Sequence, residues 1–155
     1  MKSHWSVSEE GIFCYKGRSF QQRPLNIIHV DDHQLFARGF ARIIIPFFPL
    51  ATIRNIKNGD EALSFITRSI ESGDQIDFIV TDIMHPGLRG NDLVEEIRKL
   101  ELKYHRNPIP VLVFSMYGPE LLAKWMIPGQ RSYFRYLGKA SDPDIVVDTL
   151  EEMLY

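Results

Sequence analysis

Three acidic residues that follow predicted strands are the ones in this chain best suited to chemistry. Asp31 and Asp32 come directly after the apolar run 25–30, and Asp82 ends the apolar run 77–82. Parallel strands of one sheet end at the same edge, so we expect the three carboxylates to lie close together. At an effective dielectric of about 20, two such charges about 4 Å apart repel by roughly 4 kcal/mol. A cation must therefore offset them.

Two further polar residues fall at strand ends and complete the candidate site. Ser115 ends the run 110–115, and Lys139 follows the run 132–137. Lys139 is one cation for the carboxylates, and Mg²⁺ (or Mn²⁺) is the external one, because hard divalent ions take carboxylate oxygens and keep waters for phosphate. Such a site suits phosphoryl transfer, where positioning and charge neutralisation do most of the catalysis. Each residue alone could be a cap or a solvated charge, but their coincidence at four strand ends favours a site.

Three histidines fall near the same edge. His29, His33 and His85 could contribute to a metal site. Zinc sites, however, require three or four converging nitrogen or sulfur ligands. The carboxylate-rich surroundings favour Mg²⁺, and the simpler interpretation is that these are histidines of strand ends and loops.

The elements that must position these residues alternate from residue 25 onward between apolar runs and stretches of helical period. Asn58, with Glu61 three positions later, predicts a helix start. A helix is also expected from Gly118 to about Pro128. Apolar residues spaced by three and four predict the buried helix faces: Phe36, Phe40 and Ile43; Ala62, Ile66 and Ile70; Leu93, Ile97 and Leu100; Val146, Leu150 and Met153.

Five strand-helix units predict a doubly wound, five-stranded parallel sheet, because parallel strands need crossover connections. The fold class is therefore α/β, a three-layer α/β/α sandwich. The expected strands cover 25–30, 51–56, 77–82, 110–115 and 132–137.

Composition narrows the class of protein. The 155 residues suit one domain, expected at 25–155, preceded by an extension at 1–24 that we expect to be poorly ordered. Within the extension, the apolar cluster 12–15 could be a short strand or a packed patch.

The formal charge of -2 argues against direct nucleic-acid binding. A single cysteine, Cys14, and the lack of a long apolar run or signal-peptide core predict a cytoplasmic protein without a membrane segment.

Five motifs follow one another along the chain: VDDHQLF at 30–36, NGDEAL at 58–63, DIMHPG at 82–87 with Gly90 after it, VLVFS at 111–115 and YLGK at 136–139. In these motifs the chain resembles the receiver domain of two-component response regulators, over residues 25–155. The resemblance implies a flavodoxin-like strand order, 2-1-3-4-5. The opening motif is most similar to receivers that precede helix-turn-helix output domains.

The resemblance implies a role for each polar residue of the site. Asp82 would accept a phosphoryl group from a sensor histidine kinase or a histidine phosphotransfer protein. Asp32, Asp82 and the backbone carbonyl of Met84 would hold Mg²⁺ (or Mn²⁺), and Asp31 would reach it through water. Lys139 would pair with the phosphoryl oxygens.

The resemblance also implies a switch and a control on dephosphorylation. Ser115 would bond a phosphoryl oxygen, and Tyr136 would move between outward and inward positions in response. Met84 and Tyr117 would flank the attacking water. Neither can act as a base, so a long-lived phosphoryl state is expected.

The expected function is a signalling phosphoacceptor rather than an enzyme, which switches a protein-interaction surface for an unknown output protein. A homodimer is compatible with this function. Two alternatives stay open: a receiver fragment of a DNA-binding transcriptional regulator without its output domain, and a non-phosphorylated interaction scaffold. An aspartate-nucleophile phosphatase is disfavoured, because such enzymes normally have a second Asp where this chain has Met84.

Overall fold

A five-stranded parallel sheet forms the centre of the protein. The computed structural model describes residues 5–7, 13–15, 18–19, 24–84, 86–116 and 134–154. The sheet order is β5-β4-β6-β7-β8, which in chain order is 2-1-3-4-5, as expected. Its strands are β4 (Leu25–Val30), β5 (Ala51–Ile56), β6 (Phe78–Thr81), β7 (Val111–Ser115) and β8 (Phe134–Gly138).

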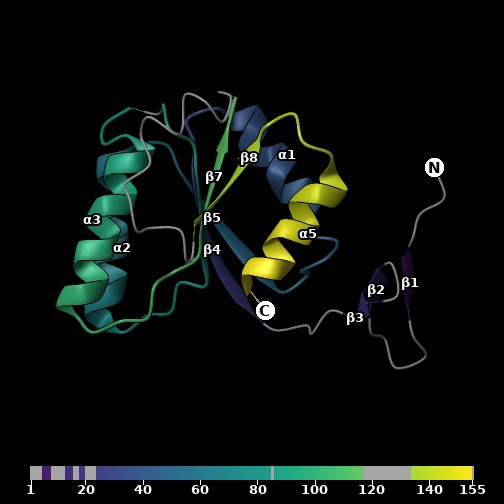
Figure 1. Cartoon of the computed structure of the whole chain (residues 1–155), viewed down its shortest axis with the longest axis horizontal. Coiled ribbons are helices and arrows are strands. Elements are labelled where there is room, and N and C mark those ends of the chain that lie inside the picture. Colours follow the sequence, from purple (N-terminus) through teal and green to yellow (C-terminus); the bar gives the residue numbers. More distant parts are fainter. Residues whose placement is uncertain are drawn as a thin grey trace.

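Helices cover both faces of this sheet, which confirms the predicted three-layer α/β/α sandwich. Helices α1 (Gln34–Ile44) and α5 (Pro143–Leu154) lie against one face, and α2 (Gly59–Ser72) and α3 (Gly90–Lys103) lie against the other (Figure 1). Pro143 opens α5, where its missing N–H leaves no helical hydrogen bond unmade. Among the residues that the structure describes, no helix has both the length and the apolar character that a membrane span requires.

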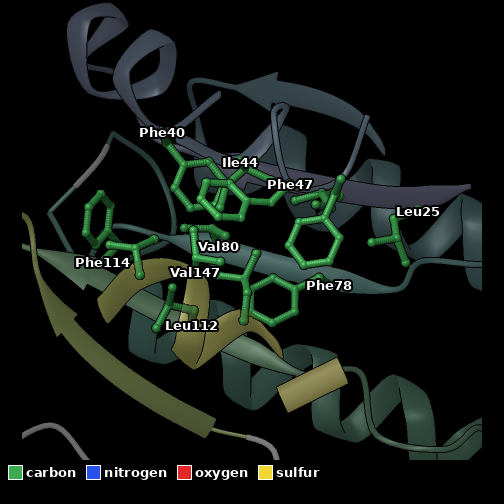
Figure 2. Close-up of a cluster of buried hydrophobic side chains, with 13 residues drawn as sticks. Leu25, Phe40, Ile44, Phe47, Phe78, Val80, Leu112, Phe114 and Val147 are labelled. Atoms are coloured by element: carbon green, nitrogen blue, oxygen red, sulfur yellow. The ribbon is translucent and has the colours of Figure 1, made fainter. Parts of the chain in front are cut away.

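The core is divided between the two faces because successive strand residues point to opposite sides. Ile27 belongs to the cluster under α1 and α5, whereas its neighbour Ile28 belongs to the cluster under α2 and α3. Figure 2 shows the first cluster, in which Phe40 and Ile44 of α1 and Val147 of α5 converge on side chains of the sheet: Leu25, Phe78, Val80, Leu112 and Phe114.

The helix faces follow the predicted pattern except in α1. That helix buries Ala37, Phe40 and Ile44, while Phe36 and Ile43 are half-buried. The buried stripe is therefore shifted by one residue from the predicted one. The cause at Phe36 is its position over a polar site residue, described below. The other helices bury most of the predicted residues and leave two half-buried: Ala62, Ile66, Ile70, Leu93, Ile97, Val146 and Leu150, with Leu100 and Met153.

Two helix ends are fixed by local chemistry that the sequence indicates. The Asn58 side chain accepts hydrogen bonds from the N–H groups of Asp60 and Glu61, at 2.8 and 3.3 Å. This confirms Asn58 as the cap of α2. Gly73 ends α2 with φ of 80°, a left-handed conformation that glycine adopts at little cost.

Three short strands lie in the N-terminal extension: β1 (Trp5–Val7), β2 (Phe13–Tyr15) and β3 (Arg18–Ser19). They form a separate antiparallel sheet. Of the two interpretations of the cluster 12–15, the strand is the one observed. The boundary expected between an extension at 1–24 and a domain at 25–155 stays a prediction. The helix expected from Gly118 to about Pro128 lies outside the described residues.

Candidate functional site

The ends of β4 and β6 place two buried carboxylates side by side. Asp31 follows β4, and its N–H donates to the carbonyl of Ile56 at 3.0 Å. Asp82 follows β6, and its N–H donates to the carbonyl of Val30 at 3.0 Å. The sheet ladder thus continues one residue past each strand. Both acidic side chains therefore start from rigid backbone.

Lys139 bridges these two carboxylates. Its Nζ lies 2.8 Å from Asp31 Oδ2 and 3.0 Å from Asp82 Oδ2. The three side chains are 2, 0 and 7% exposed, so the bridge is shielded from solvent. The N–H of Lys139 donates to the carbonyl of Ser115 at 2.8 Å, which fixes the lysine to the end of β7. The expected convergence of Asp31, Asp82 and Lys139 at one sheet edge is observed.

Phe36 is a site residue that sequence reasoning treated only as core. Lys139 Nζ lies 4.2 Å from the centroid of the Phe36 ring. A cation over an aromatic face is attracted to the ring electrons, and the ring also covers the ammonium from solvent. The signal was present in the sequence, since Phe36 lies in the first turn of the helix that follows Asp31 and Asp32.

Asp32 and His33 lie at the more exposed side of the same cluster. Their side chains are 34 and 59% exposed, and His33 Nδ1 lies 3.3 Å from Asp32 Oδ1 and 3.5 Å from Asp31 Oδ1. The N–H of His33 donates to Asp31 Oδ1 at 2.9 Å. One potential ligand atom from each of Asp31, Asp32, His33 and Asp82 lies within 4.8 Å of every other.

This donor set fits a divalent cation. Three carboxylates and one ammonium carry a formal charge of -2, which a dication would neutralise. Asp32 Oδ1 is buried and accepts no hydrogen bond within the described part of the chain. A buried carboxylate oxygen without such a partner is costly, and a metal ion is one way to satisfy it. Asp31, Asp32 and Asp82 could therefore hold a divalent metal ion.

The loop after Asp82 is held against the site by close backbone contacts. The N–H of Gly59, at the start of α2, donates to the carbonyl of Pro86 at 2.9 Å. A Cβ added at Gly90 would overlap the carbonyl oxygen of Asp82, so only glycine fits there. This loop carries Met84, which is 40% exposed. The role of the Met84 carbonyl as a metal ligand stays a prediction.

The predicted switch residues lie on the neighbouring strands. Ser115 ends β7 and is fully buried. Tyr136 lies in β8, where it is half-buried against Ile83 and Val113, and burial raises the pKa of its phenol. Their switching roles stay predictions. Tyr117 and His85 lie outside the described residues.

His29 was expected near this edge of the sheet, but its complete burial beside Asp31 was not. Its side chain is 0% exposed, its ring lies 4.9 Å from that of Phe40, and Nε2 lies 3.8 Å from Asp31 Oδ2. Neither ring nitrogen forms a hydrogen bond within the described part of the chain. Burial lowers the pKa of His29 from 6.5 to about 4, against the opposing field of Asp31. The sequence did indicate that His29 lies on the same side of the sheet as Asp31, because side chains two positions apart in a strand point to the same face.

Comparisons with known proteins agree with this geometry. A family model described as "response regulator receiver domain" matches residues 27–151. A curated relative, the transcriptional regulatory protein DegU of Brevibacillus brevis, is 26% identical over 130 residues, which cover 84% of this chain and 50% of that protein. The chain thus spans about half the length of this relative.

Two examples illustrate the solved structures that share this fold. One is the signal receiver domain of the putative response regulator NarL from Mycobacterium tuberculosis, with a TM-score of 0.67 and 20% identity over 85% of this chain and 97% of that one. The other is a DNA-binding response regulator of the LuxR family from Staphylococcus aureus, with a TM-score of 0.65 and 18% identity over 84% and 99% of the two chains.

The buried His29 predicts a specific pH dependence of stability in EDTA. Between pH 6.5 and about 4, the unfolded chain binds a proton at this residue that the folded protein excludes. Stability is therefore lost as the pH falls through this window, by up to about 3 kcal/mol from this group. His29→Leu should remove that part of the loss, as measured by urea unfolding at several pH values.

His105→Asn is the matched control, because His105 is exposed in the turn that follows α3. It should retain the wild-type loss between pH 6.5 and 4. Parallel stability curves for wild type and His29→Leu across this window would show that His29 does not exclude the proton.

Proposed function

Because the chain belongs to the response regulator receiver domain family, we propose that Asp82 accepts a phosphoryl group from a phosphohistidine on a sensor kinase or histidine phosphotransfer protein. The observation that carries the proposal is the contact between Lys139 Nζ and Asp82 Oδ2 at 3.0 Å. It places a cation beside the carboxylate that would receive the phosphoryl group, within the cluster that Asp31 and Asp32 complete.

In the transfer step, a carboxylate oxygen of Asp82 forms a bond to phosphorus as the bond from phosphorus to the histidine nitrogen breaks. The nitrogen leaves with its electron pair, and an acyl phosphate remains on Asp82. Asp32, Asp82 and the Met84 carbonyl would hold Mg²⁺, and Asp31 would reach it through water; the ion would supply positive charge against the phosphoryl oxygens. The rigid backbone of the site lets the carboxylates meet this group without rearrangement of the strands.

Arrival of the phosphoryl group changes the partners of Lys139. In the structure, Lys139 Nζ bridges the carboxylates of Asp31 and Asp82. A dianionic phosphoryl group on Asp82 would compete with these carboxylates for the same ammonium. The backbone N–H of Lys139 donates a hydrogen bond to the carbonyl of Ser115, so a shift of the lysine would act on the end of β7. We propose that Ser115 and Tyr136 carry this change to a protein-interaction surface. A coupling free energy of about 1–3 kcal/mol would be sufficient.

The curated relative that aligns with this chain is named a transcriptional regulatory protein, and one solved neighbour is named a DNA-binding response regulator. These names suggest a transcriptional output as the process that the receiver controls. In this proposal the described domain supplies the phosphorylation signal, while nucleic-acid contacts belong to another domain or protein.

Intact mass spectrometry tests the phosphoacceptor directly. After incubation with Mg²⁺ and a small phosphodonor such as acetyl phosphate, the wild-type protein should gain the mass of one phosphoryl group. Asp82→Asn should gain none, because an amide does not form the acyl phosphate. Asp74→Asn is the matched control, since Asp74 is exposed and lies outside the acidic cluster, and should be labelled like wild type. An unlabelled wild type would reject the proposal.

Thermal unfolding tests Asp32 as a metal ligand. A ligand at about 100 times its Kd stabilises the folded state by about 2.7 kcal/mol, which corresponds to a rise of several degrees in Tm for a chain of this size. Mg²⁺ should raise the Tm of wild type by this order and that of Asp32→Asn by much less. In EDTA, Asp32→Asn should be at least as stable as wild type, because it removes one of three clustered charges. Equal Mg²⁺ shifts in both proteins would contradict the assignment.

The lifetime of the phosphoryl group tests the proposed role of Met84. Met84 is 40% exposed, follows Asp82 by two residues, and has a thioether that cannot act as a base for water. The acyl phosphate should therefore persist for minutes or longer after the phosphodonor is removed. Met84→Glu should shorten this lifetime, and Met84→Leu should preserve it. Loss of the label within seconds from wild type would show that hydrolysis does not depend on this position.

A further inference from the structure

The Lys139 ammonium has an aromatic ring among its contacts as well as two carboxylates. Its Nζ lies 4.2 Å from the centroid of the Phe36 ring, in addition to its contacts with Asp31 and Asp82 at 2.8 and 3.0 Å. An ammonium has three donor hydrogens, and the two carboxylates can accept from two of them. The ring attracts the charge with its electrons but offers no oxygen or nitrogen acceptor.

The Phe36 ring stands on a rigid part of α1. One turn later in this helix, Phe40 is buried, and its ring lies 6.0 Å from that of Phe114 in β7. The ring of His33 meets Phe36 edge to face, with centroids 6.0 Å apart and planes at 90°. The backbone N–H of His33 in turn donates to Asp31 Oδ1 at 2.9 Å. These contacts fix the orientation of the Phe36 ring toward the ammonium.

Burial makes the contact between ring and ammonium stronger than a surface contact of the same kind. The Lys139 side chain is 2% exposed, while Phe36 is half-buried. A cation over a ring is stabilised more when both are removed from water than at an exposed site. A smaller side chain at position 36 would admit water beside Nζ. The higher local dielectric would then weaken every charge interaction of the lysine.

The ring also leaves the ammonium available to a phosphoryl group. A water molecule or a polar side chain in its place would accept a hydrogen bond from Nζ and compete with phosphoryl oxygens, whereas the ring cannot. The lysine can therefore turn from the carboxylates to the phosphoryl group while it stays against Phe36. A cation held in a dry position before the reaction stabilises the developing charge without further reorganisation.

We propose that Phe36 is a positioning residue for phosphoryl transfer, whose ring holds the Lys139 ammonium in a dry position from which it turns to the phosphoryl oxygens. The inference rests on the proposed function, in which Asp82 is the acceptor. It gives the first turn of α1 a part in the site through an apolar side chain.

NMR of the unphosphorylated protein tests the contact in solution. The ring current shifts nuclei over an aromatic face upfield, and the ε-methylene group of Lys139 is bonded to Nζ. With ¹³C-labelled lysine, wild type should therefore show one upfield ε-methylene signal, assigned by its loss in Lys139→Arg. Phe36→Leu should return this signal to the range of exposed lysines. An unshifted Lys139 signal in wild type overturns the inference.

Phe65→Leu is the matched control for Phe36→Leu. Phe65 is also half-buried and also lies under a cation, with the guanidinium carbon of Arg54 at 4.5 Å from its ring centroid. It belongs to α2, on the other face of the sheet. The same chemical change there should leave the Lys139 signal at its wild-type position.

Initial rates of phosphorylation test the function of the contact. With Mg²⁺ and acetyl phosphate, Phe36→Leu should form the adduct about tenfold more slowly than wild type, as expected for loss of a desolvated cation–π contact. Phe65→Leu should keep the wild-type rate, and Phe36→Tyr, which retains a ring, should recover most of it. Thermal melts show that each variant is folded. A wild-type rate in Phe36→Leu, or equal losses in both leucine variants, overturns the inference.

The two measurements separate this inference from the proposed function. No adduct on wild type, together with an upfield Lys139 signal, rejects phosphoryl transfer and leaves the contact between ring and ammonium established. A normal adduct with an unshifted signal rejects the role of Phe36 alone. In the phosphorylated protein, the Lys139 signal should move but remain upfield, because the ammonium turns while it keeps the ring. A signal in the range of exposed lysines would overturn the inference.

Discussion

The site depends on the ion pairs that join Lys139 to Asp31 and Asp82. Lys139 follows β8, Asp31 follows β4 and Asp82 follows β6, so one ammonium connects the ends of three strands. All three side chains are almost fully buried. Removing one partner would leave an uncompensated buried charge, which is far costlier than losing a surface pair. The position of each strand end therefore matters to the other two, and the sheet edge behaves as one electrostatic unit.

This arrangement explains how a chemical event at Asp82 could act at a distance. Lys139 is fixed at its backbone by Ser115 and at its side chain by the carboxylates. A new anion on Asp82 would change the partners of the Lys139 side chain first, and the backbone hydrogen bond would carry any displacement to β7. Tyr136, three residues before Lys139 in β8, packs on Ile83 just after Asp82. Local charge and strand packing are thus coupled within a few residues of the proposed phosphoacceptor.

The sequence predicted the parts of the fold that depend on periodic burial and on strand ends. Apolar runs located the five strands of the parallel sheet, and parallel topology brought Asp31, Asp82 and Lys139 together. The sequence did not predict that Phe36 would contact Lys139 or that His29 would be buried beside Asp31. Phe36 has helical spacing that suits a core residue, and only the path of the Lys139 side chain places an ammonium over its ring. His29 has the strand parity of Asp31, but its complete burial depends on α1 and the contact with Phe40.

The two described histidines of the site differ because burial differs on the two sides of Asp31. His29 is fully enclosed and its pKa is lowered to about 4, so it remains neutral behind the carboxylate. The side chain of His33 is 59% exposed, and Asp32 and Met84 are partly exposed, whereas the side chains of Asp31 and Lys139 are buried. An incoming phosphoryl donor or metal ion would therefore meet Asp32 and His33 before it reached Lys139. The exposed side chains would be the first contacts of such a ligand, and the buried ion pairs behind them join the strand ends that would respond to it.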